Sequence, residues 1–313
     1  MTTTFSRFLD DIITHYDTKG EDFGNQDRNS LKLFQLEKEE RVSFLQRVLL
    51  IGCLVFLVII GFFYFNHVKN KHQVEKELIR KKQELEIQKN NEIVELKNCI
   101  EKTNQDNSSF LISKDLFAIR QLLIQIPELK PLLFNKKLID IISNNFDKDA
   151  FLTKAIYFDK PQSSNWFVSY HQDLSISVSE RKEVENYKNW TFKKGQHGVQ
   201  PPVQILENTL TVRIHLDDTN KENGALKVLP NSHLNGVIRN DSEEVKRETK
   251  VFCEVSSGGI MLMKPLLFHA SERTTNNQRR RVIHLEFNSK QLHPKLNWLE
   301  YMPINIPAQN LNQ

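Results

Sequence analysis

Two histidines and one aspartate are spaced as ligands of a single metal ion. His171 and Asp173 end the apolar stretch NWFVSYHQD, and His269 ends the later stretch GIMLMKPLLFH. Residues i and i+2 of a strand point to the same side, so His171 and Asp173 can reach one ion together. Two imidazoles and one carboxylate leave one face of an octahedral ion open. That arrangement suits a non-haem Fe(II), which must also bind a co-substrate and O2.

A run of three arginines, Arg279, Arg280 and Arg281, follows the second histidine. A dicarboxylate co-substrate that chelates iron at one end needs a cation for its far carboxylate, and a guanidinium offers a planar donor pair for it. Each feature is common alone: an HxD arises by chance, a strand-end histidine is usually surface or core, and an arginine run is usually solvated. Their conjunction in this order predicts a metal site with an anion-binding arginine.

The stretches that carry these residues are predicted to be short strands. Residues 209–216 (TLTVRIHL) alternate strictly between apolar and polar side chains, and residues 259–269 and 280–287 also read as strands. The alternation places Leu210, Val212, Ile214 and Leu216 on one face and Thr211, Arg213 and His215 on the other. Each strand would therefore turn one set of side chains toward a core.

Helices are expected before these strands. Ser113 can cap a helix that runs through Leu122, and a second helical pattern follows Pro127. Its apolar positions are Leu132, Leu133, Leu138, Ile141 and Ile142. Many short strands after a few helices predict a mainly β domain with helices, for which a double-stranded β-helix (jelly roll) is the natural candidate.

The domain from about Ser113 to Pro303 resembles the phytanoyl-CoA dioxygenase family. The resemblance lies in Asn165-Trp166 ahead of HQD, then HGVQPPVQILENTLTVRIHLDD, ENGALKVLPNSH, MKPLLFHAS and RRRVIHLEF. It implies a jelly-roll fold, Fe(II) held by His171, Asp173 and His269, and 2-oxoglutarate as co-substrate.

The same resemblance suggests roles for residues near the metal. The family's co-substrate arginine falls on Arg280, with its two neighbours as alternatives one register away. The family often has a hydroxyl two residues after the distal histidine, and here that residue is Ser271. Gln172 and Trp190 are further candidates for lining the co-substrate site.

Several other polar residues have simpler interpretations. The family's Pro-Gly-Ser-His turn reads PNSH here, and Asn231 can adopt the left-handed conformation in place of glycine. His233 is expected to belong to that structural turn. Arg213 and His215 can face the pocket or bond within the barrel, and both alternatives stay open. His197, in the loop GQHG, is a candidate lid residue.

The reaction that the resemblance implies is hydroxylation of a small organic molecule, with O2 consumed and succinate and CO2 released. A halogenating relative would need an open iron position for chloride, and Asp173 occupies it here. One alternative is a catalytically inactive, membrane-tethered sensor or interaction module on the same fold. Another is a cupin-like metal protein without a co-substrate.

An uncharged apolar run, VLLIGCLVFLVIIGFFYF, begins at residue 48. At ~1.5 Å per residue it nearly crosses a hydrocarbon layer of ~30 Å, which predicts a transmembrane helix at 48–66. The polar segment 1–47 before it argues against a cleaved signal peptide. Lysines and arginines are in excess after the run, so we expect a single-pass protein whose catalytic domain faces the cytoplasm.

Residues 67–109 are highly charged and are expected to form a helical stalk followed by a linker at 102–109. Glu77 and Lys81 are one of its i,i+4 pairs. The apolar positions keep no clean heptad, so a plain stalk and a homodimeric coiled coil both stay open. The jelly-roll domain is expected at 110–303, with a tail at 304–313.

Composition excludes some classes of function. The net charge is only +4, and no basic face with interleaved aromatic residues is evident, so nucleic acid is not an expected partner. The three cysteines are widely spaced, which argues against a disulfide framework and a structural zinc site.

Overall fold

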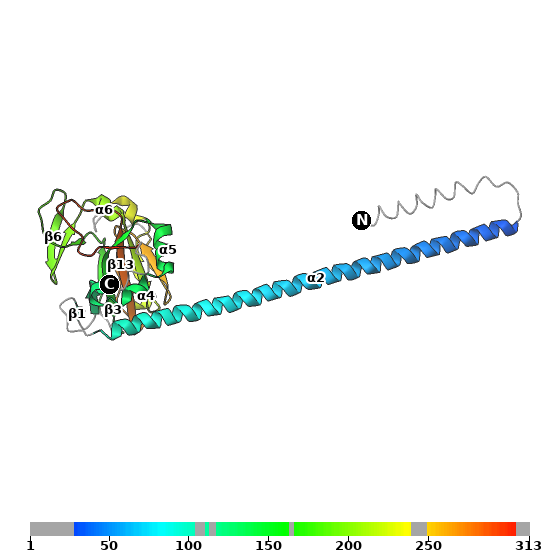
Figure 1. Cartoon of the computed structure of the whole chain (residues 1–313), viewed down its shortest axis with the longest axis horizontal. Coiled ribbons are helices and arrows are strands. Elements are labelled where there is room, and N and C mark those ends of the chain that lie inside the picture. Colours follow the sequence, from blue (N-terminus) through cyan, green and yellow to red (C-terminus); the bar gives the residue numbers. More distant parts are fainter. Residues whose placement is uncertain (1–27, 104–109, 113–116, 163–165, 239–248, 305–313) are drawn as a thin grey trace. The chain divides into compact units, whose positions relative to one another are not determined.

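A computed structural model of the chain describes residues 28–103, 110–112, 117–162, 166–238 and 249–304. The chain divides into two compact units, Met1–Lys82 and Gln83–Gln313. Helix α2 (Arg28–Glu101) begins in the first unit and ends in the second (Figure 1). The expected tail after Ile304, the start of segment 1–47 and residues 104–109 of the expected linker lie outside the described residues.

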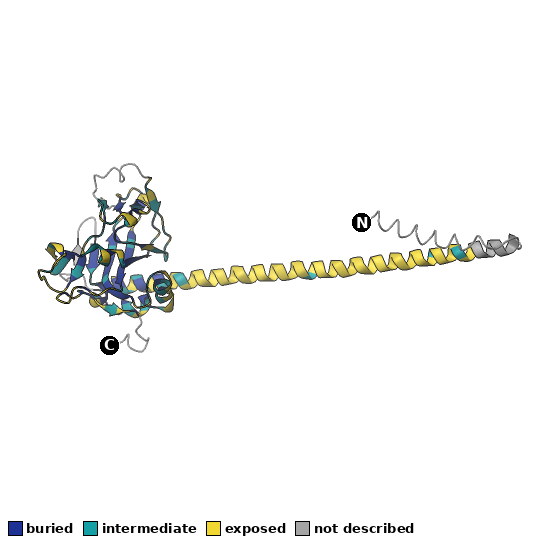
Figure 2. Ribbon diagram, turned by 90° about the horizontal axis from the view of Figure 1, so that it is seen from above, coloured by how far each residue is buried: buried dark blue, intermediate teal, exposed yellow. Residues whose placement is uncertain are grey.

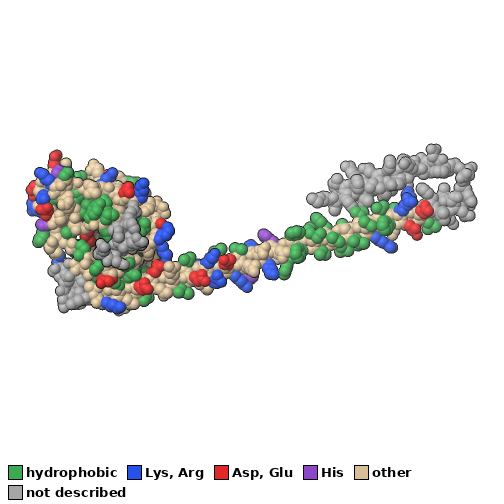
Figure 3. Space-filling view, viewed as in Figure 1, with side chains coloured by type: hydrophobic (Ala, Val, Ile, Leu, Met, Phe, Trp, Pro, Cys, Tyr) green, Lys and Arg blue, Asp and Glu red, His purple; other side chains and the backbone are tan. Residues whose placement is uncertain are grey.

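The described part of the first unit is the N-terminal part of α2. Its apolar stretch has a mean hydropathy of 2.9 and none of it is buried, so α2 is long and apolar enough to be a candidate membrane span. Hydrophobic side chains gather along this stretch in Figure 3. The long charged helix expected after it is also present, and Glu77 and Lys81 lie 3.4 Å apart on its exposed surface.

The second unit is built on antiparallel strands arranged in three sheets. The largest has the order β1-β2-β3-β13-β8-β11, with β14 also paired to β3; the others are β10-β9-β12-β4 and β5-β7-β6. The strands are β1 (Phe110–Ile112), β2 (Phe117–Arg120), β3 (Phe151–Lys160), β4 (Val168–His171), β5 (Ile176–Val178), β6 (Lys188–Lys193), β7 (Gln196–Gln200), β8 (Thr209–His215), β9 (Leu226–Val228), β10 (Val251–Cys253), β11 (Ile260–Met263), β12 (His269–Ser271), β13 (Arg280–Asn288) and β14 (Met302–Pro303). The expected class, a mainly β jelly roll with helices, is confirmed.

The largest sheet has two different faces. One face packs against α3 (Leu122–Gln125), α4 (Leu129–Leu133) and α5 (Lys136–Asn145), whose buried side chains share one core with it. The apolar side chains that line this face are Leu210, Val212, Ile214, Leu216, Ile283, Leu285 and Phe287. The alternation predicted for residues 209–216 is therefore confirmed. Its polar face is also buried, because that face lines the interior of the jelly roll.

The C-terminal end of α2 belongs to this second unit. Ile93, Leu96 and Ile100 are 7%, 5% and 5% exposed and join the core under the largest sheet. Figure 2 shows buried residues at this end of the helix and in many of the strands. The compact unit thus begins at Gln83, earlier than the domain start expected at residue 110.

Two local predictions need correction. The helix expected from Ser113 through Leu122 is replaced by strand β2, which pairs with β3 through Ile119 and Tyr157; Ser113 lies outside the described residues. The single strand expected at 259–269 is divided into β11 and β12, which lie in different sheets. Pro265 falls in the break and has no backbone N–H for a sheet hydrogen bond. The strand at 280–287 and helices after Pro127 are confirmed.

Candidate metal centre

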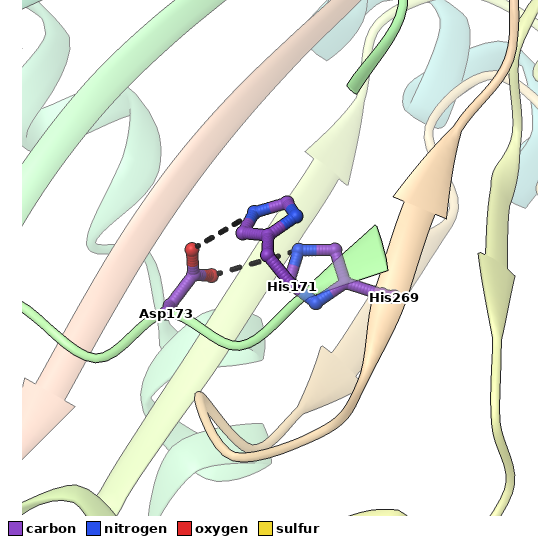
Figure 4. A group of neighbouring side chains, drawn as sticks. All are labelled: His171, Asp173 and His269. Atoms are coloured by element: carbon purple, nitrogen blue, oxygen red, sulfur yellow. Dashed lines mark ion pairs between the residues drawn. The ribbon is translucent and has the colours of Figure 1, made fainter. Parts of the chain in front are cut away.

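The three predicted ligands meet where β4 and β12 pair. His171 and His269 are direct partners across this pair, and their ring centroids lie 4.3 Å apart. Asp173 follows β4, and its backbone N–H donates to the Pro265 carbonyl at 2.9 Å. Figure 4 shows all three side chains pointing toward one another. One potential ligand atom from each residue lies within 4.8 Å of the others, which is the arrangement expected around one ion.

Backbone carbonyls orient both imidazole rings. Nδ1 of His171 lies 2.8 Å from the Ser169 carbonyl, and Nδ1 of His269 lies 2.8 Å from the Leu267 carbonyl. A carbonyl can only accept, so each Nδ1 carries the proton and each Nε2 is left for a metal. The two Nε2 atoms face the Asp173 carboxylate, at 3.5 Å for His171 and 3.8 Å for His269.

The charges at this site favour a cation. Burial alone would raise the pKa of Asp173, but its hydrogen bond with His171 and the nearby His269 outweigh burial and hold that pKa well below its usual range. The same hydrogen bond raises the pKa of His171, while burial lowers the pKa of His269. A divalent ion would take the place of the proton shared by His171 and Asp173.

A cavity of about 140 Å³, which we call the metal-side cavity, adjoins the triad, and Arg213, Ser271 and Arg280 help to line it. Of the three consecutive arginines, only Arg280 is on this wall. Arg279 pairs with Asp159 at 2.5 Å and Arg281 with Asp217 at 2.8 Å.

Two buried guanidiniums near the triad lack a carboxylate partner among the described residues. Arg280 donates to the Gly224 carbonyl, and Arg213 contacts Nδ1 of His284 at 3.1 Å. The Nε atoms of both arginines are buried without a hydrogen-bond partner in the described part of the chain. Burial and the neighbouring Arg213 lower the pKa of Arg280 to about 9. Buried unpaired charge is costly, so this wall fits an anionic group.

The remaining predicted residues fall into two groups. Ser271 lines the cavity and donates to the Gly224 carbonyl at 3.0 Å. Gln172 points away, because neighbours along an extended chain face opposite sides; its amide bonds to Leu266 and Ile238. Trp190 packs against a separate hydrophobic cluster that includes Val178 and Trp298. It lines neither this cavity nor the larger one beside it.

The structure also places other residues that the sequence pointed to. His215 bonds to Thr219 at 2.7 Å within the fold. Asn231 has φ 61°, so the expected left-handed turn before His233 is confirmed. Asn165 lies outside the described residues, whereas Trp166 lines the metal-side cavity.

His284 and Glu286 also belong to the site, although neither was predicted from the sequence. Their signal was the alternation of RRVIHLEF, which puts them on the same face of β13 as Arg280. His284 contacts Arg213 on one side and Glu286 on the other, at 3.1 Å each. Lys154 then pairs with Glu286 at 2.8 Å. This buried chain of contacts fixes Arg213 beside the triad.

A second cavity, of about 400 Å³, lies next to the first. Phe158, Asp173 and His284 belong to the walls of both. The rest of its lining comes largely from β6, β7 and the segment after Asp173, and it includes His197, the candidate lid residue.

Comparison with known proteins gives a family and a fold. The family model described as "Phytanoyl-CoA dioxygenase (PhyH)" matches residues 98–282. EctD from S. alaskensis is similar in fold both with bound Fe and with 2-oxoglutarate and 5-hydroxyectoine. Each structure has a TM-score of 0.50 and 18% identity over 65% of this chain, covering 71% and 70% of EctD, respectively.

EvdMO1 has a TM-score of 0.48 and 20% identity over 64% of this chain. The match covers only 45% of EvdMO1. Comparison with curated proteins gives no match.

Proposed function

Because the chain belongs to the phytanoyl-CoA dioxygenase family, we propose that it is an Fe(II)- and 2-oxoglutarate-dependent oxygenase that hydroxylates a small organic molecule. His171, Asp173 and His269 would hold Fe(II). The observation that carries this proposal is their convergence within 4.8 Å, beside a buried arginine with no carboxylate partner in the described chain. The donor set leaves one face of the ion open for 2-oxoglutarate and O2.

Each side chain has a defined task in this proposal. The carbonyls of Ser169 and Leu267 hold the imidazoles with Nε2 toward the ion. Arg280 binds the far carboxylate of 2-oxoglutarate, and the Ser271 hydroxyl lies on the same wall. When bound, iron and 2-oxoglutarate supply the oxidising chemistry: one oxygen atom enters the substrate C–H bond, and the other enters succinate as CO2 leaves.

Arg213 keeps the cavity positive. Its contacts through His284 to Glu286 and Lys154 hold it in the cavity wall, with the Nε atom unpartnered in the described chain. EctD crystallised with 2-oxoglutarate and 5-hydroxyectoine shares the fold, which supports the assignment of the co-substrate.

Fe(II) binding and succinate formation test this function. Anaerobically loaded wild-type protein should retain one iron per chain and form succinate from 2-oxoglutarate once O2 is admitted. Asp173→Ala should lose both, whereas Asp140→Ala, which removes an exposed carboxylate on α5, should keep both. Wild-type levels of succinate from Asp173→Ala would rule the proposal out.

We further propose that residues 48–66 anchor the protein in a membrane with the catalytic domain in the cytoplasm. The unburied apolar stretch of α2 and the excess of lysine and arginine after it support this. Protease added to sealed inside-out vesicles should cleave the catalytic domain, and right-side-out vesicles should protect it; the reverse pattern would contradict the orientation. A homodimer through the stalk stays a proposal, testable by cross-linking.

A catalytically inactive sensor on the same fold is the second candidate. It is favoured by the way α2 ends on the jelly roll: Glu101 pairs with Arg281 at 2.8 Å, one residue from Arg280. A protein that binds iron and 2-oxoglutarate but forms no succinate with any tested substrate would favour this candidate.

A further inference from the structure

We infer that the primary substrate is a compact polar anion, with a carboxylate or phosphate group held between Arg120 and Lys193 in the 400 Å³ cavity. This inference rests on the proposed function, because it takes that cavity as the place from which substrate faces the metal. We call this 400 Å³ cavity the substrate cavity.

The position and size of the substrate cavity suit a small molecule. It shares Asp173 with the metal-side cavity, so a molecule bound there lies beside one of the three ligand residues. Its volume is near the lower end of the ~300–1,000 Å³ range of small-ligand sites. We therefore expect a ligand that is short enough to lie wholly inside.

The charges on its walls do not cancel. Three cations line the cavity, namely Arg120, Lys154 and Lys193, against the two carboxylates Asp173 and Glu286. Lys154 is neutralised by Glu286, whose two oxygens lie 2.8 Å from its Nζ. Asp173 is engaged by the triad histidines. The excess charge therefore belongs to Arg120 and Lys193.

Arg120 and Lys193 are available to a ligand. Neither side chain forms an ion pair or hydrogen bond with any residue that the structure describes. Arg120 is half-buried at the end of β2 in the largest sheet, and Lys193 is exposed at the end of β6 in the smallest. An anion between them would join two sheets, and charge-assisted hydrogen bonds are the stronger kind.

The uncharged lining also favours a polar ligand. Asn189, Thr191, Gln196 and Gln200 present amides and a hydroxyl to the cavity. A long acyl chain would cover these groups without giving them a hydrogen-bond partner, at a cost for each group. A cationic ligand would meet two uncompensated positive charges. Both classes are therefore disfavoured relative to a polar anion.

Calorimetry on the full-length protein, loaded anaerobically with Fe(II) and 2-oxoglutarate, tests this inference. The anionic probes are N-acetyl-L-leucine and glycerol 3-phosphate. The neutral counterparts are N-acetyl-L-leucine amide and glycerol, and the cationic one is L-leucine amide. At least one anion should bind about tenfold or more tightly than its counterparts, because an ionic hydrogen bond contributes roughly that factor. The tighter of the two anionic probes identifies the carboxylate or phosphate.

The double variant Arg120→Gln/Lys193→Gln should weaken anion binding about tenfold or more. Lys290→Gln/Lys295→Gln removes the same charge at exposed positions outside the cavity and should leave the affinity unchanged. The single variant Lys193→Gln repeats the test without touching the core.

Anions that bind no tighter than their neutral or cationic counterparts, or that do not bind at all, would overturn the inference. So would unchanged affinity in the double variant. Iron and 2-oxoglutarate binding, measured in the same samples, separates this failure from that of the proposed function: both should persist in every variant.

Discussion

At the residue scale, the site depends on a few side chains whose orientation is fixed before any ligand binds. The two histidines lie next to each other across β4 and β12, and each donates Nδ1–H to a carbonyl two residues earlier. Rotation of either ring would break that bond inside the fold. Folding therefore orders these side chains in advance, and metal binding costs little further side-chain entropy.

The first prediction concerns the choice among the three arginines. Arg280→Gln should weaken 2-oxoglutarate binding to the iron-loaded protein by about tenfold or more, because it removes a buried charge from the cavity wall. Arg279→Gln is the matched control, since Arg279 pairs with Asp159 and does not line the cavity. Calorimetry measures both affinities. A loss confined to Arg279→Gln would contradict the assignment.

The second prediction is a pH dependence of stability. Burial raises the pKa of Glu300 from an ordinary value of 4.5 to about 7 in the folded protein. Between these two values the folded state holds more protons than the unfolded state, so the free energy of unfolding falls as pH rises through this window. The full effect is about 3 kcal/mol, and it is complete above pH 7.

Glu300→Gln removes this titration and keeps an oxygen for the Ala155 N–H. The variant should therefore gain stability over wild type at pH 8 and little at pH 4.5. Urea unfolding at the two pH values measures the difference. An equal change at both values would show that Glu300 does not titrate as described.

At the element scale, the turn after the 3-10 helix η1 (Lys221–Asn223) supports the cavity wall that carries Ser271 and Arg280. Gly224 has φ 85°, and its carbonyl accepts from Ser271 and Arg280. A Cβ at this position would lie 2.7 Å from the Glu272 carbonyl oxygen and 2.7 Å from Nζ of Lys160. Only glycine fits both the backbone conformation and the space.

The third prediction follows from this turn. Gly224→Ala should destabilise the protein by more than about 1 kcal/mol and weaken 2-oxoglutarate binding, because the strained turn carries the acceptor of Arg280. Gly195→Ala is the control: its φ is 72°, but nothing lies within 4 Å of its Cβ position. Urea unfolding should show the smaller loss for Gly195→Ala and no change in co-substrate affinity. Equal losses of stability and of co-substrate affinity in the two variants would show that packing around Gly224 does not matter.

The elements that sequence predicted best are those with local patterns. The alternation in β8 was readable because its apolar face packs under helices, and Asn231 was readable because its left-handed turn has few alternatives. Strand β2 was not readable, since its conformation depends on pairing with β3, far along the chain. Local pattern also could not show which arginine enters the cavity. That choice depends on Asp159 and Asp217, which pair with the other two arginines.

At the scale of the whole molecule, the last part of α2 is a structural part of the jelly-roll unit. Ile93, Leu96 and Ile100 are buried in its core, and Lys97 pairs with Asp217 at 2.9 Å. The charged composition of the stalk concealed this, because Glu95, Lys97 and Asn98 stand among the three apolar residues and remain exposed or half-buried.

The fourth prediction compares two fragments. A fragment that begins at Gln83 should be more stable to urea than one that begins at Phe110, by several kcal/mol. Burial of each large apolar side chain contributes roughly 1.5–3 kcal/mol, and the shorter fragment lacks three of them. Equal unfolding midpoints would mean that this end of α2 is not part of the folded unit.

The most direct test of the central claim is the weak visible charge-transfer band that an Fe(II)–2-oxoglutarate chelate gives under anaerobic conditions. The full-length protein should show the band only when both iron and 2-oxoglutarate are present. Asp173→Ala should lose it, and Asp140→Ala should keep it. Folded, iron-loaded wild-type protein without the band, or Asp173→Ala with the band undiminished, would contradict the assignment of this site to a 2-oxoglutarate-dependent oxygenase.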